Sequence, residues 1–323
     1  MNERGILDLI IIRLPKLSVR EKIFLSEMLE SETDLIRKSQ SDIEHIINRK
    51  IPSLWNLDAV RKQAVRDAET ARLREIKWVA LRDSAYPPLL REIYDPPLLL
   101  FYRGRLPNPE LPLAGIVGTR KPCPRSAAQA YDIAKELGQS GISVVSGLAK
   151  GIDAMAHRGN IDGGASTVAV LGSGADVIYP LTNRQLARRI LETGGAVLTE
   201  YPPGTSPYKW NFPARNRIIS GLSRGVLIAE APQKSGSLIT AGFALEQNRE
   251  LWVASAGTGG NDGNKVFDRR GTEKLAEDGA QVINSASDIL TAWNIKKNVR
   301  ESEHIAGGPD MAASLAHSLG ISI

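Results

Sequence analysis

Short apolar runs alternate with longer helix-forming stretches through the C-terminal two thirds of the chain. Six runs fit this description, at residues 114–117, 143–146, 167–171, 197–199, 226–229 and 251–254. Near-continuous apolar runs of this length are typical of strands buried on both faces, and intervening helices return the chain so that successive strands lie parallel. The pattern predicts a doubly wound, mostly parallel α/β sheet, in which ligands bind at the carboxyl ends of the strands.

The N-terminal quarter follows a helical pattern instead. Apolar residues recur at helical spacing, as at Leu25, Met28 and Leu29, and glycine is absent from residues 6–103. Prolines clustered between residues 87 and 112 cannot continue a helix or pair in a central strand, so they mark a lead-in segment. We expect three parts: a small all-helical domain, an α/β domain and a short tail, at residues 1–75, 76–295 and 296–323.

Glycine and small polar residues follow the predicted strands. They form four loops, at residues 118–120, 147–149, 172–174 and 235–237. Because the carboxyl ends of parallel strands meet at one edge of a sheet, these loops should converge. Glycine lets a phosphate approach backbone amides, and a helix that starts there adds a favourable dipole. Each glycine alone is more often a tight turn, but four corresponding loops favour an anion-binding site.

A basic window lies between residues 201 and 229. It contains four cations and four aromatic residues but no acid: Lys209, Arg215, Arg217, Arg224, Tyr201, Tyr208, Trp210 and Phe212. Cations that follow phosphates and rings that stack on unpaired bases are what single-stranded nucleic acid requires. The alternative is a loop whose rings pack on the domain and whose arginines are solvated. The window alone leaves both interpretations open.

Composition narrows the cellular context. The chain has 323 residues, a formal net charge of +5 and one cysteine, Cys123. A single cysteine excludes an internal disulfide framework and a cysteine-cluster zinc site, so a reducing cytoplasm is the expected location. The longest early apolar run, residues 9–12, is too short for a signal peptide or a membrane span. We expect no membrane association.

Catalytic motifs are not evident. The chain lacks the phosphate loop of nucleotide-hydrolysing motors and the complete glycine fingerprint of dinucleotide-binding enzymes. Asp153 and His157 lie four residues apart on a predicted helix, where structural hydrogen bonding is favoured over a metal site. Glu200 and Glu230 each end a strand, where a carboxylate could orient a ribose, act as a base or hold an arginine in place. We expect no cofactor, no metal and no catalysis.

Several ordered motifs resemble one family. Over residues 78–290 the chain is similar to DNA-processing protein A, the DprA/Smf family. The motifs that carry the resemblance are Tyr86-Pro87, residues 117–120, 146–153, Ala156-His157, Tyr179-Pro180 with Asn183, residues 212–219, 235–241 and Gly279-Ala280.

The resemblance implies an extended Rossmann-like domain that binds single-stranded DNA, forms a homodimer and loads the RecA recombinase onto incoming DNA in natural transformation, protecting that DNA. It implies no enzymatic activity. The N-terminal helices would correspond to the sterile-alpha-motif-like or helix-hairpin-helix-like domain of many members.

Residue roles follow from the same resemblance. Arg120 would contact phosphate, Lys209, Arg215 and Arg217 would line a positive wall, and Phe212 would be a base platform. Arg184 would place a further cation nearby, while Gly147 and the serine-glycine loop would supply backbone donors. The implied DNA-binding residues are Gly118, Thr119, Arg120, Gly147, Arg184, Lys209, Phe212, Arg215, Asn216, Arg217, Ser235, Gly236 and Ser237.

The chain departs from the family pattern at three places. It has Arg125-Ser126 where members often have Tyr-Gly, and Ala256-Gly257 where Pro-Gly is usual. The tail is too short for the winged-helix domain of many members, so no winged helix is expected.

Two other functions compete with DNA binding. One is a nucleoside monophosphate N-glycosidase of the related Rossmann-like phosphoribohydrolases, with Glu200 or Glu230 as acid/base residue. Those enzymes carry a Pro-Gly-Gly-x-Gly-Thr loop, whereas this chain has Ser-Ala-Gly-Thr-Gly-Gly at residues 255–260. The other is a scaffold whose helical domain and tail dock partners, with DNA binding incidental.

Overall fold

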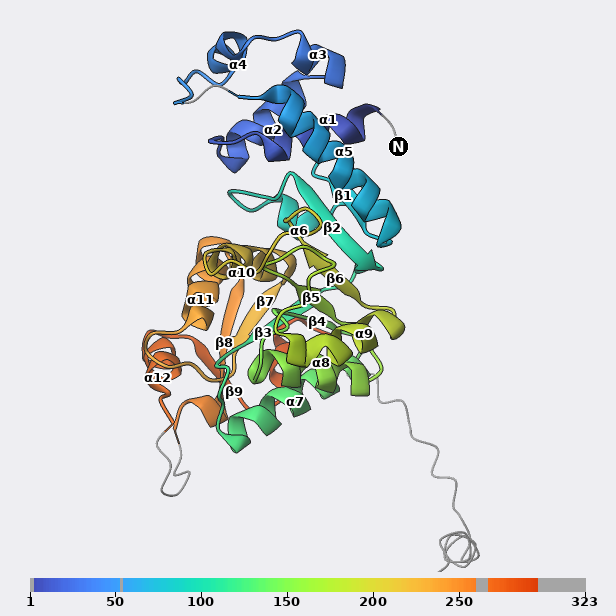
Figure 1. Cartoon of the computed structure of the whole chain (residues 1–323). Coiled ribbons are helices and arrows are strands. Elements are labelled where there is room, and N and C mark those ends of the chain that lie inside the picture. The colour runs from blue at the N-terminus through green and yellow to red at the C-terminus, as the bar shows by residue number, and fades with distance from the viewer. Residues whose placement is uncertain (1–2, 53–54, 260–266, 296–323) are drawn as a thin grey trace, which may run out of the picture.

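The structure is a computed structural model that describes residues 3–52, 55–259 and 267–295. The predictions for the tail and for Gly260 lie outside these residues. Figure 1 shows a helical region above a large α/β unit, with two strands between them. The helical region contains α1 (Glu3–Arg13), α2 (Val19–Met28), α3 (Glu32–Ile36), α4 (Gln40–Ile46) and α5 (Leu57–Leu73).

A nine-stranded sheet forms the centre of the molecule, in the order β1-β2-β6-β5-β4-β3-β7-β8-β9. The strands from β6 across to β9 run parallel, while β1 and β2 pair antiparallel at one edge. Their bounds are β1 Lys77–Ala80, β2 Leu99–Gly104, β3 Leu113–Val117, β4 Ser143–Ser146, β5 Val168–Val170, β6 Ala196–Thr199, β7 Gly225–Ile228, β8 Glu250–Ala254 and β9 Gln281–Ile283. The predicted fold class is confirmed.

All six predicted strands are present, and sequence patterns missed three others. Strands β1 and β9 lie at the two edges of the sheet, where one side of each strand has no partner, and β2 lies second from one edge, between β1 and β6. Only Ile283 is buried in the three residues of β9, and β2 ends in two half-buried residues and an exposed glycine. Strand β9 lacks the continuous apolar run that identifies a strand buried on both faces, whereas the apolar residues of β2 lie within the proline-marked segment that we predicted as a lead-in.

Helices cover both faces of the sheet. The helices after β1 are α6 (Pro88–Arg91), α7 (Pro124–Gln139), α8 (Ile152–Asp162), α9 (Arg184–Glu192), α10 (Asn211–Leu222), α11 (Gly236–Glu246), α12 (Arg270–Glu277) and α13 (Ala286–Ala292), with short 3-10 turns η1 (Leu181–Asn183) and η2 (Ser255–Gly257). Buried residues of α7, α8, α9 and α13 pack on one face, and those of α6, α10 and α11 on the other.

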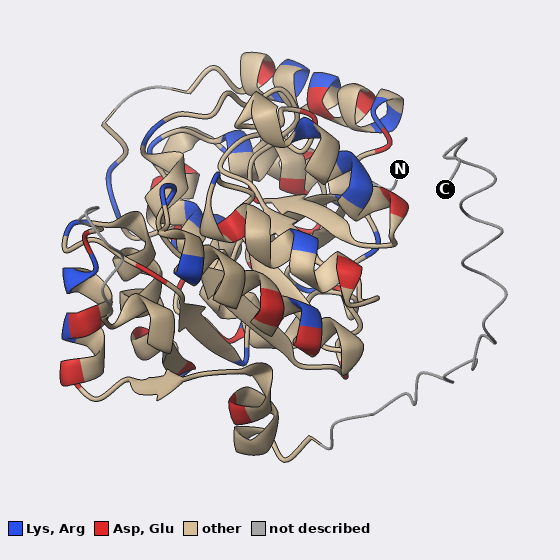
Figure 2. Cartoon of the chain, turned by 90° about the horizontal axis from the view of Figure 1, so that it is seen from below, with Lys and Arg blue, Asp and Glu red and all other residues tan. Residues whose placement is uncertain are grey.

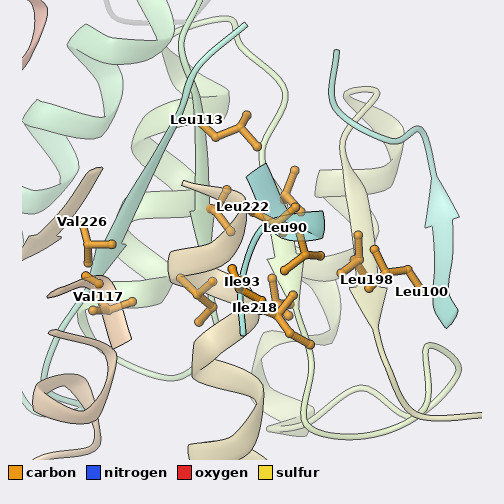
Figure 3. Packing of buried hydrophobic residues seen from close by; sticks show 14 of the residues in the cluster. Leu90, Ile93, Leu100, Leu113, Val117, Leu198, Ile218, Leu222 and Val226 are labelled. Carbon is orange, nitrogen blue, oxygen red and sulfur yellow. The ribbon is translucent and has the colours of Figure 1, made fainter. Parts of the chain in front are cut away.

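Alternation along the central strands explains these two layers. In β3, Leu113 and Val117 point to the face covered by α10, whereas Ala114 and Ile116 point to the face covered by α7. Figure 3 shows the first of these layers, where Leu113 and Val117 lie with Val226 of β7 against residues of α6 and α10. Because successive residues of a strand point to opposite faces and helices cover both, apolar residues are needed at odd and even positions alike. The central strands are therefore continuous apolar runs in the sequence.

The N-terminal helices are capped by their own sequence. Ser18, Ser31 and Ser39 each begin a helix with a capping box completed by an acidic residue three positions later. The helices share a core with the antiparallel strands, since Leu9 and Leu25 belong to the same buried cluster as residues of β1 and β2. Arg82 also pairs with Asp8 across this junction, whereas the Arg13–Asp67 pair, at 2.7 Å, lies within the helical region. Packing therefore crosses the boundary predicted at residue 75, and the type of helical domain stays a prediction.

The direction of winding reverses beside β3. From β3 the chain proceeds through β4 and β5 to β6 on one side, and then returns through α10 to β7 on the other. In such sheets a crevice opens beyond the carboxyl ends of the two strands at the reversal. Within the described ranges, no helix combines the length and apolar character that crossing a bilayer requires.

Candidate functional site

A pocket of about 1050 Å³ opens at this reversal point, beyond β3 and β7. The loops after β3, β4 and β7 line it together with the first residues of α10 and α11. The predicted convergence of loops is found here for three of the four loops, at residues 118–120, 149 and 235–237. This volume is at the upper end of the range of small-molecule sites and leaves room for an extended ligand.

Asp153 joins two of the pocket loops from beneath. Its Oδ2 accepts the backbone N–H groups of Gly147 at 3.1 Å and Ala149 at 3.3 Å, and the carboxylate also accepts the Gly118 N–H. Burial raises the pKa of Asp153, while Arg215 and these three amides oppose that rise. Gly151 brings the same loops together: its φ is 75°, and a Cβ there would lie 2.4 Å from the Thr119 carbonyl oxygen.

Arg215 forms part of the pocket floor and is buried. Its Nη1 donates to the Gly147 carbonyl at 2.9 Å and to the Val170 carbonyl. The guanidinium packs directly on Gly147, where an added Cβ would lie 2.6 Å from both terminal nitrogens. Burial lowers the pKa of Arg215 to about 10, with Asp153 opposing the shift. Arg215 therefore stays charged at neutral pH, and its charge is met inside the fold by two carbonyl groups and the nearby Asp153.

Arg217 lies outside the pocket lining. Its two terminal nitrogens each donate to Glu200 at 2.7 Å, and its Nε donates to Asp95 at 2.9 Å. Burial alone would lower the pKa of Arg217, but Glu200 and Asp95 hold it above its ordinary value. Arg217 was predicted to line the positive wall. The structure instead places its guanidinium outside the pocket lining, where carboxylates from two other segments hold it.

The exposed cations are arranged differently. Arg120, Lys121, Lys209 and Lys234 line the pocket, are exposed, and form no ion pair with any residue in the described ranges. Elsewhere Lys and Arg are interspersed with Asp and Glu along the helices (Figure 2). An anion entering the pocket therefore meets several cations that no protein group neutralises.

The acids that line the pocket are already engaged. Asp153 is buried beneath the loops, and the Glu230 carboxylate accepts the Cys123 N–H at 3.1 and 3.2 Å. Asp268 pairs with Arg270 at 2.8 Å. The pocket thus presents more free positive than free negative charge.

An aromatic wall borders the cations. Phe212, in the first turn of α10, lies against Tyr179, with ring centroids 5.6 Å apart and ring planes tilted by 46°. Both rings line the pocket, and Tyr179 is 44% exposed. Gly172 allows this approach, since a Cβ there would come within 3.0 Å of the Phe212 ring. A planar apolar ligand can stack on such a surface.

The start of α11 supplies polar groups. Ser235 caps the helix by accepting the Ser237 N–H at 3.3 Å, and the two hydroxyls lie 2.7 Å apart. Asn216 holds this turn in place by donating to the Gly236 carbonyl at 3.0 Å. The N-terminal end of an 11-residue helix therefore lines the pocket beside Lys234, and the positive end of its dipole favours an anion there.

The structure brings most of the predicted residues together. Ten line the pocket: Gly118, Thr119, Arg120, Lys209, Phe212, Arg215, Asn216, Ser235, Gly236 and Ser237. Gly147, Arg184 and Arg217 do not. The Gly147 N–H is occupied by Asp153, so this glycine supports Arg215 rather than supplying a donor.

The lining residues that the predicted set omits include two lysines and a tyrosine. Lys121 directly follows the Gly-Thr-Arg loop, Lys234 directly precedes the Ser-Gly-Ser loop, and Tyr179 lies in the quoted Tyr-Pro motif. Adjacency to a predicted loop was the available signal for both lysines. Only the fold shows that Tyr179 and Phe212, 33 positions apart in sequence, form one wall.

The residues proposed for catalysis have structural partners. Glu200 is not part of the pocket lining and holds Arg217, as one of its three considered roles predicted. His157 is buried, its Nδ1 lies 2.8 Å from the Thr167 hydroxyl, and burial lowers its pKa to about 3. Among the described residues, no three His, Cys, Asp or Glu side chains gather as a metal site would require.

Two of the departures from the family pattern lie side by side. The buried Ser126 hydroxyl donates to the Ala256 carbonyl at 3.1 Å, linking the start of α7 to the turn η2. Gln129 accepts the Ala256 N–H at 2.7 Å in the same place. Neither Arg125-Ser126 nor Ala256-Gly257 is part of the pocket lining.

Comparison with known proteins agrees with the family resemblance that the sequence motifs indicate. A family model described as DNA recombination-mediator protein A matches residues 77–294. Protein Smf of Synechocystis sp. is 46% identical over 214 residues, which make up 65% of this chain and 52% of that protein. The chain thus spans about half the length of that relative.

Two solved structures are also similar. The X-ray structure of DprA from Streptococcus pneumoniae matches with a TM-score of 0.68 and 32% identity, covering 90% of this chain and 98% of that one. DprA from Helicobacter pylori, a structure concerned with single-stranded DNA binding, matches with a TM-score of 0.56 and 29% identity, covering 68% and 96%.

Proposed function

The chain belongs to the DNA recombination-mediator protein A family, known as DprA or Smf, and on this premise we propose that it binds single-stranded DNA in the pocket beyond β3 and β7. The observation that carries the proposal is the set of four exposed, unpaired cations beside the Tyr179–Phe212 wall. The relative from Helicobacter pylori, whose structure concerns single-stranded DNA binding, supports it.

Each part of the pocket suits one part of a single strand. Arg120, Lys209 and the N-terminal end of α11 would contact phosphates, and Phe212 would stack with an unpaired base. Contacts to phosphate and to the faces of bases carry little sequence information. Duplex DNA keeps its bases stacked within the helix, so binding should favour the single strand and depend only weakly on sequence.

Fluorescence anisotropy tests this proposal. A labelled oligothymidylate and the corresponding duplex are titrated with the full chain over a salt series. We expect preference for the single strand, with log K falling against log salt by about 0.7 for each phosphate contacted. Arg120→Ala should weaken binding to every sequence, whereas Arg158→Ala, an exposed arginine on α8 outside the pocket lining, should not. Unchanged affinity in Arg120→Ala would remove the pocket from the proposal.

We further propose that the bound strand is protected and passed to the RecA recombinase, in the cytoplasm, during natural transformation. Family membership supports this role. Assembly of RecA on DNA coated with single-strand-binding protein should accelerate with the full chain and not with Arg120→Ala. A chain that binds DNA but leaves RecA assembly unchanged would contradict the loading role alone.

Two further expectations complete the proposed function. The protein should form a homodimer, so light scattering after size exclusion should give twice the mass of one chain. It should also be without catalysis, since Glu200 and Glu230 are engaged by Arg217 and by the Cys123 amide. Incubation with nucleoside monophosphates should release no free base; release of base would favour the N-glycosidase alternative.

A further inference from the structure

An aromatic pair outside the pocket lining has no role in the site described so far. Tyr208 and Trp210 stack on each other with ring centroids 4.9 Å apart and planes within 4° of parallel. The two residues are 48% and 70% exposed. A parallel, exposed pair of this kind leaves outer ring faces open to solvent, and large aromatic rings are usually buried or used for binding.

The pair adjoins the pocket through the backbone. Lys209 lies between the two rings in sequence and lines the pocket, and Phe212 follows two residues after Trp210. Rings and cation therefore alternate along the chain up to the aromatic wall of the pocket. No acid occurs between residues 201 and 229, so the loop itself adds no repulsion toward phosphate.

The loop that carries the pair is fixed at several points. Gly174 donates to the Thr205 carbonyl at 2.9 Å, and the Gly204 N–H donates to Asp176 at 2.9 Å. At the other end, the Asn211 side chain donates to the Gly172 carbonyl at 2.9 Å. A platform held in this way loses little conformational entropy when a ligand stacks on it.

We propose that the Tyr208–Trp210 pair is a second base-binding subsite, which stacks with an unpaired base next to the phosphate held by Lys209. This inference rests on the proposed function, because it extends the path of the same strand. The two rings already form a stack, and a base would continue it on an outer face. Sequence preference should stay low, since every base has an aromatic face.

Trp210→Ala tests the subsite, with Trp210→Phe retaining a ring and Tyr94→Ala as a control at an exposed ring distant in sequence from the loop. Binding is measured with oligothymidylates of about 4 and about 12 nucleotides, which bracket the pocket and its surroundings. For the longer oligomer, Trp210→Ala should weaken binding about 5-fold to 100-fold, the contribution of one base–aromatic stack. Trp210→Phe should retain most of the affinity, and Tyr94→Ala all of it.

Two readouts separate stacking from other causes. The dependence of log K on log salt should be the same in Trp210→Ala as in the unsubstituted chain, because no phosphate contact is lost. Tryptophan emission should fall on DNA binding in the unsubstituted chain and not in Trp210→Phe. An altered molecular mass in Trp210→Ala would show instead that the pair contacts a second copy of the chain, and would overturn the proposal.

The two proposals fail in different ways. If the unsubstituted chain binds the longer oligomer but Trp210→Ala binds it equally well, the subsite is wrong and the pocket stands. If the unsubstituted chain binds neither oligomer, the proposed function fails first. A loss of affinity that is equal for both oligomers would place Trp210 inside the pocket path and contradict a separate subsite.

Discussion

The buried and the exposed cations of this protein differ in what holds their charge. Arg215 and Arg217, from the most distinctive motif in the sequence, are buried and held by carbonyl or carboxylate groups of the fold. Arg120 and Lys209 are exposed at the pocket and have no ionic partner among the described residues. The motif arginines therefore build the pocket, and the exposed cations are available to a ligand.

The comparison shows that positive charge in a motif is not the same as positive charge offered to a polyanion. A guanidinium already paired with a carboxylate adds little field at the surface, and removing it leaves an unpaired buried acid. An exposed lysine contributes little to stability but its full charge to binding. Substitutions in the two sets should accordingly affect different measurements.

The largest effect should come from breaking the Arg217 network. Arg217→Ala leaves Glu200, whose side chain is only 16% exposed, without its guanidinium partner and should lower the free energy of unfolding by about 3–5 kcal/mol. Urea unfolding measures this loss. Lys209→Ala is the matched control and should change stability by no more than about 0.5 kcal/mol. Equal stability of the two variants would contradict the division into buried and exposed cations.

A second effect should appear in the pH dependence of stability, through the buried His157 near Arg215. Burial, followed by the charge of Arg215, lowers the pKa of His157 to about 3. Below its ordinary value of about 6.5 the unfolded chain binds a proton there and the folded chain does not, so stability is lost as pH falls. Between pH 6.5 and pH 5 the loss should reach about 2 kcal/mol.

Urea unfolding at a series of pH values measures this slope, and His157→Gln provides the comparison. The slope between pH 6.5 and pH 5 should become flatter in the variant, whatever its stability at neutral pH. An unchanged slope would show that another group titrates there.

A smaller effect should come from removing one of the exposed cations of the pocket. Lys209→Ala should weaken single-stranded DNA binding about tenfold, as expected for one charged contact, and should reduce the salt dependence by about 0.7. Anisotropy titrations at several salt concentrations measure both quantities, with Arg158→Ala as control. Weaker binding with the full salt dependence retained would mean that Lys209 does not contact phosphate.

The smallest effect should follow from Ser126→Ala, at the departure from the family pattern. The Ala256 carbonyl then loses its buried donor, which should cost about 1 kcal/mol of unfolding free energy. DNA affinity should not change, because neither residue lines the pocket. A variant with normal stability and altered affinity would give this pair a binding role.

Sequence patterns predicted the layers of the fold better than they predicted which charged side chains the fold pairs and which it leaves exposed. The strands beside the pocket are recognisable because both of their faces are buried, as Val117 and Ile116 illustrate. Edge strands such as β9 lack that signal. The loops at residues 118–120 and 235–237 were predictable because glycine and serine follow the strands in order.

The pairing of Arg217 was not predictable in the same way. Its partner Asp95 lies 122 positions away in the proline-rich lead-in, and Glu200 was open to three roles. Only the folded chain brings these groups together. Likewise, the acid-free window indicated positive charge without showing which of its cations the fold neutralises.

The central claim is that exposed cations, rather than the motif arginine Arg217, contact DNA phosphates. The salt dependence of single-stranded DNA binding tests it most directly, compared between Arg120→Ala and the double variant Arg217→Met/Glu200→Gln, which removes both charges of the buried pair together. The account predicts a slope reduced by about 0.7 in Arg120→Ala and unchanged in the double variant. The reverse result, a reduced slope only in the double variant, would contradict it.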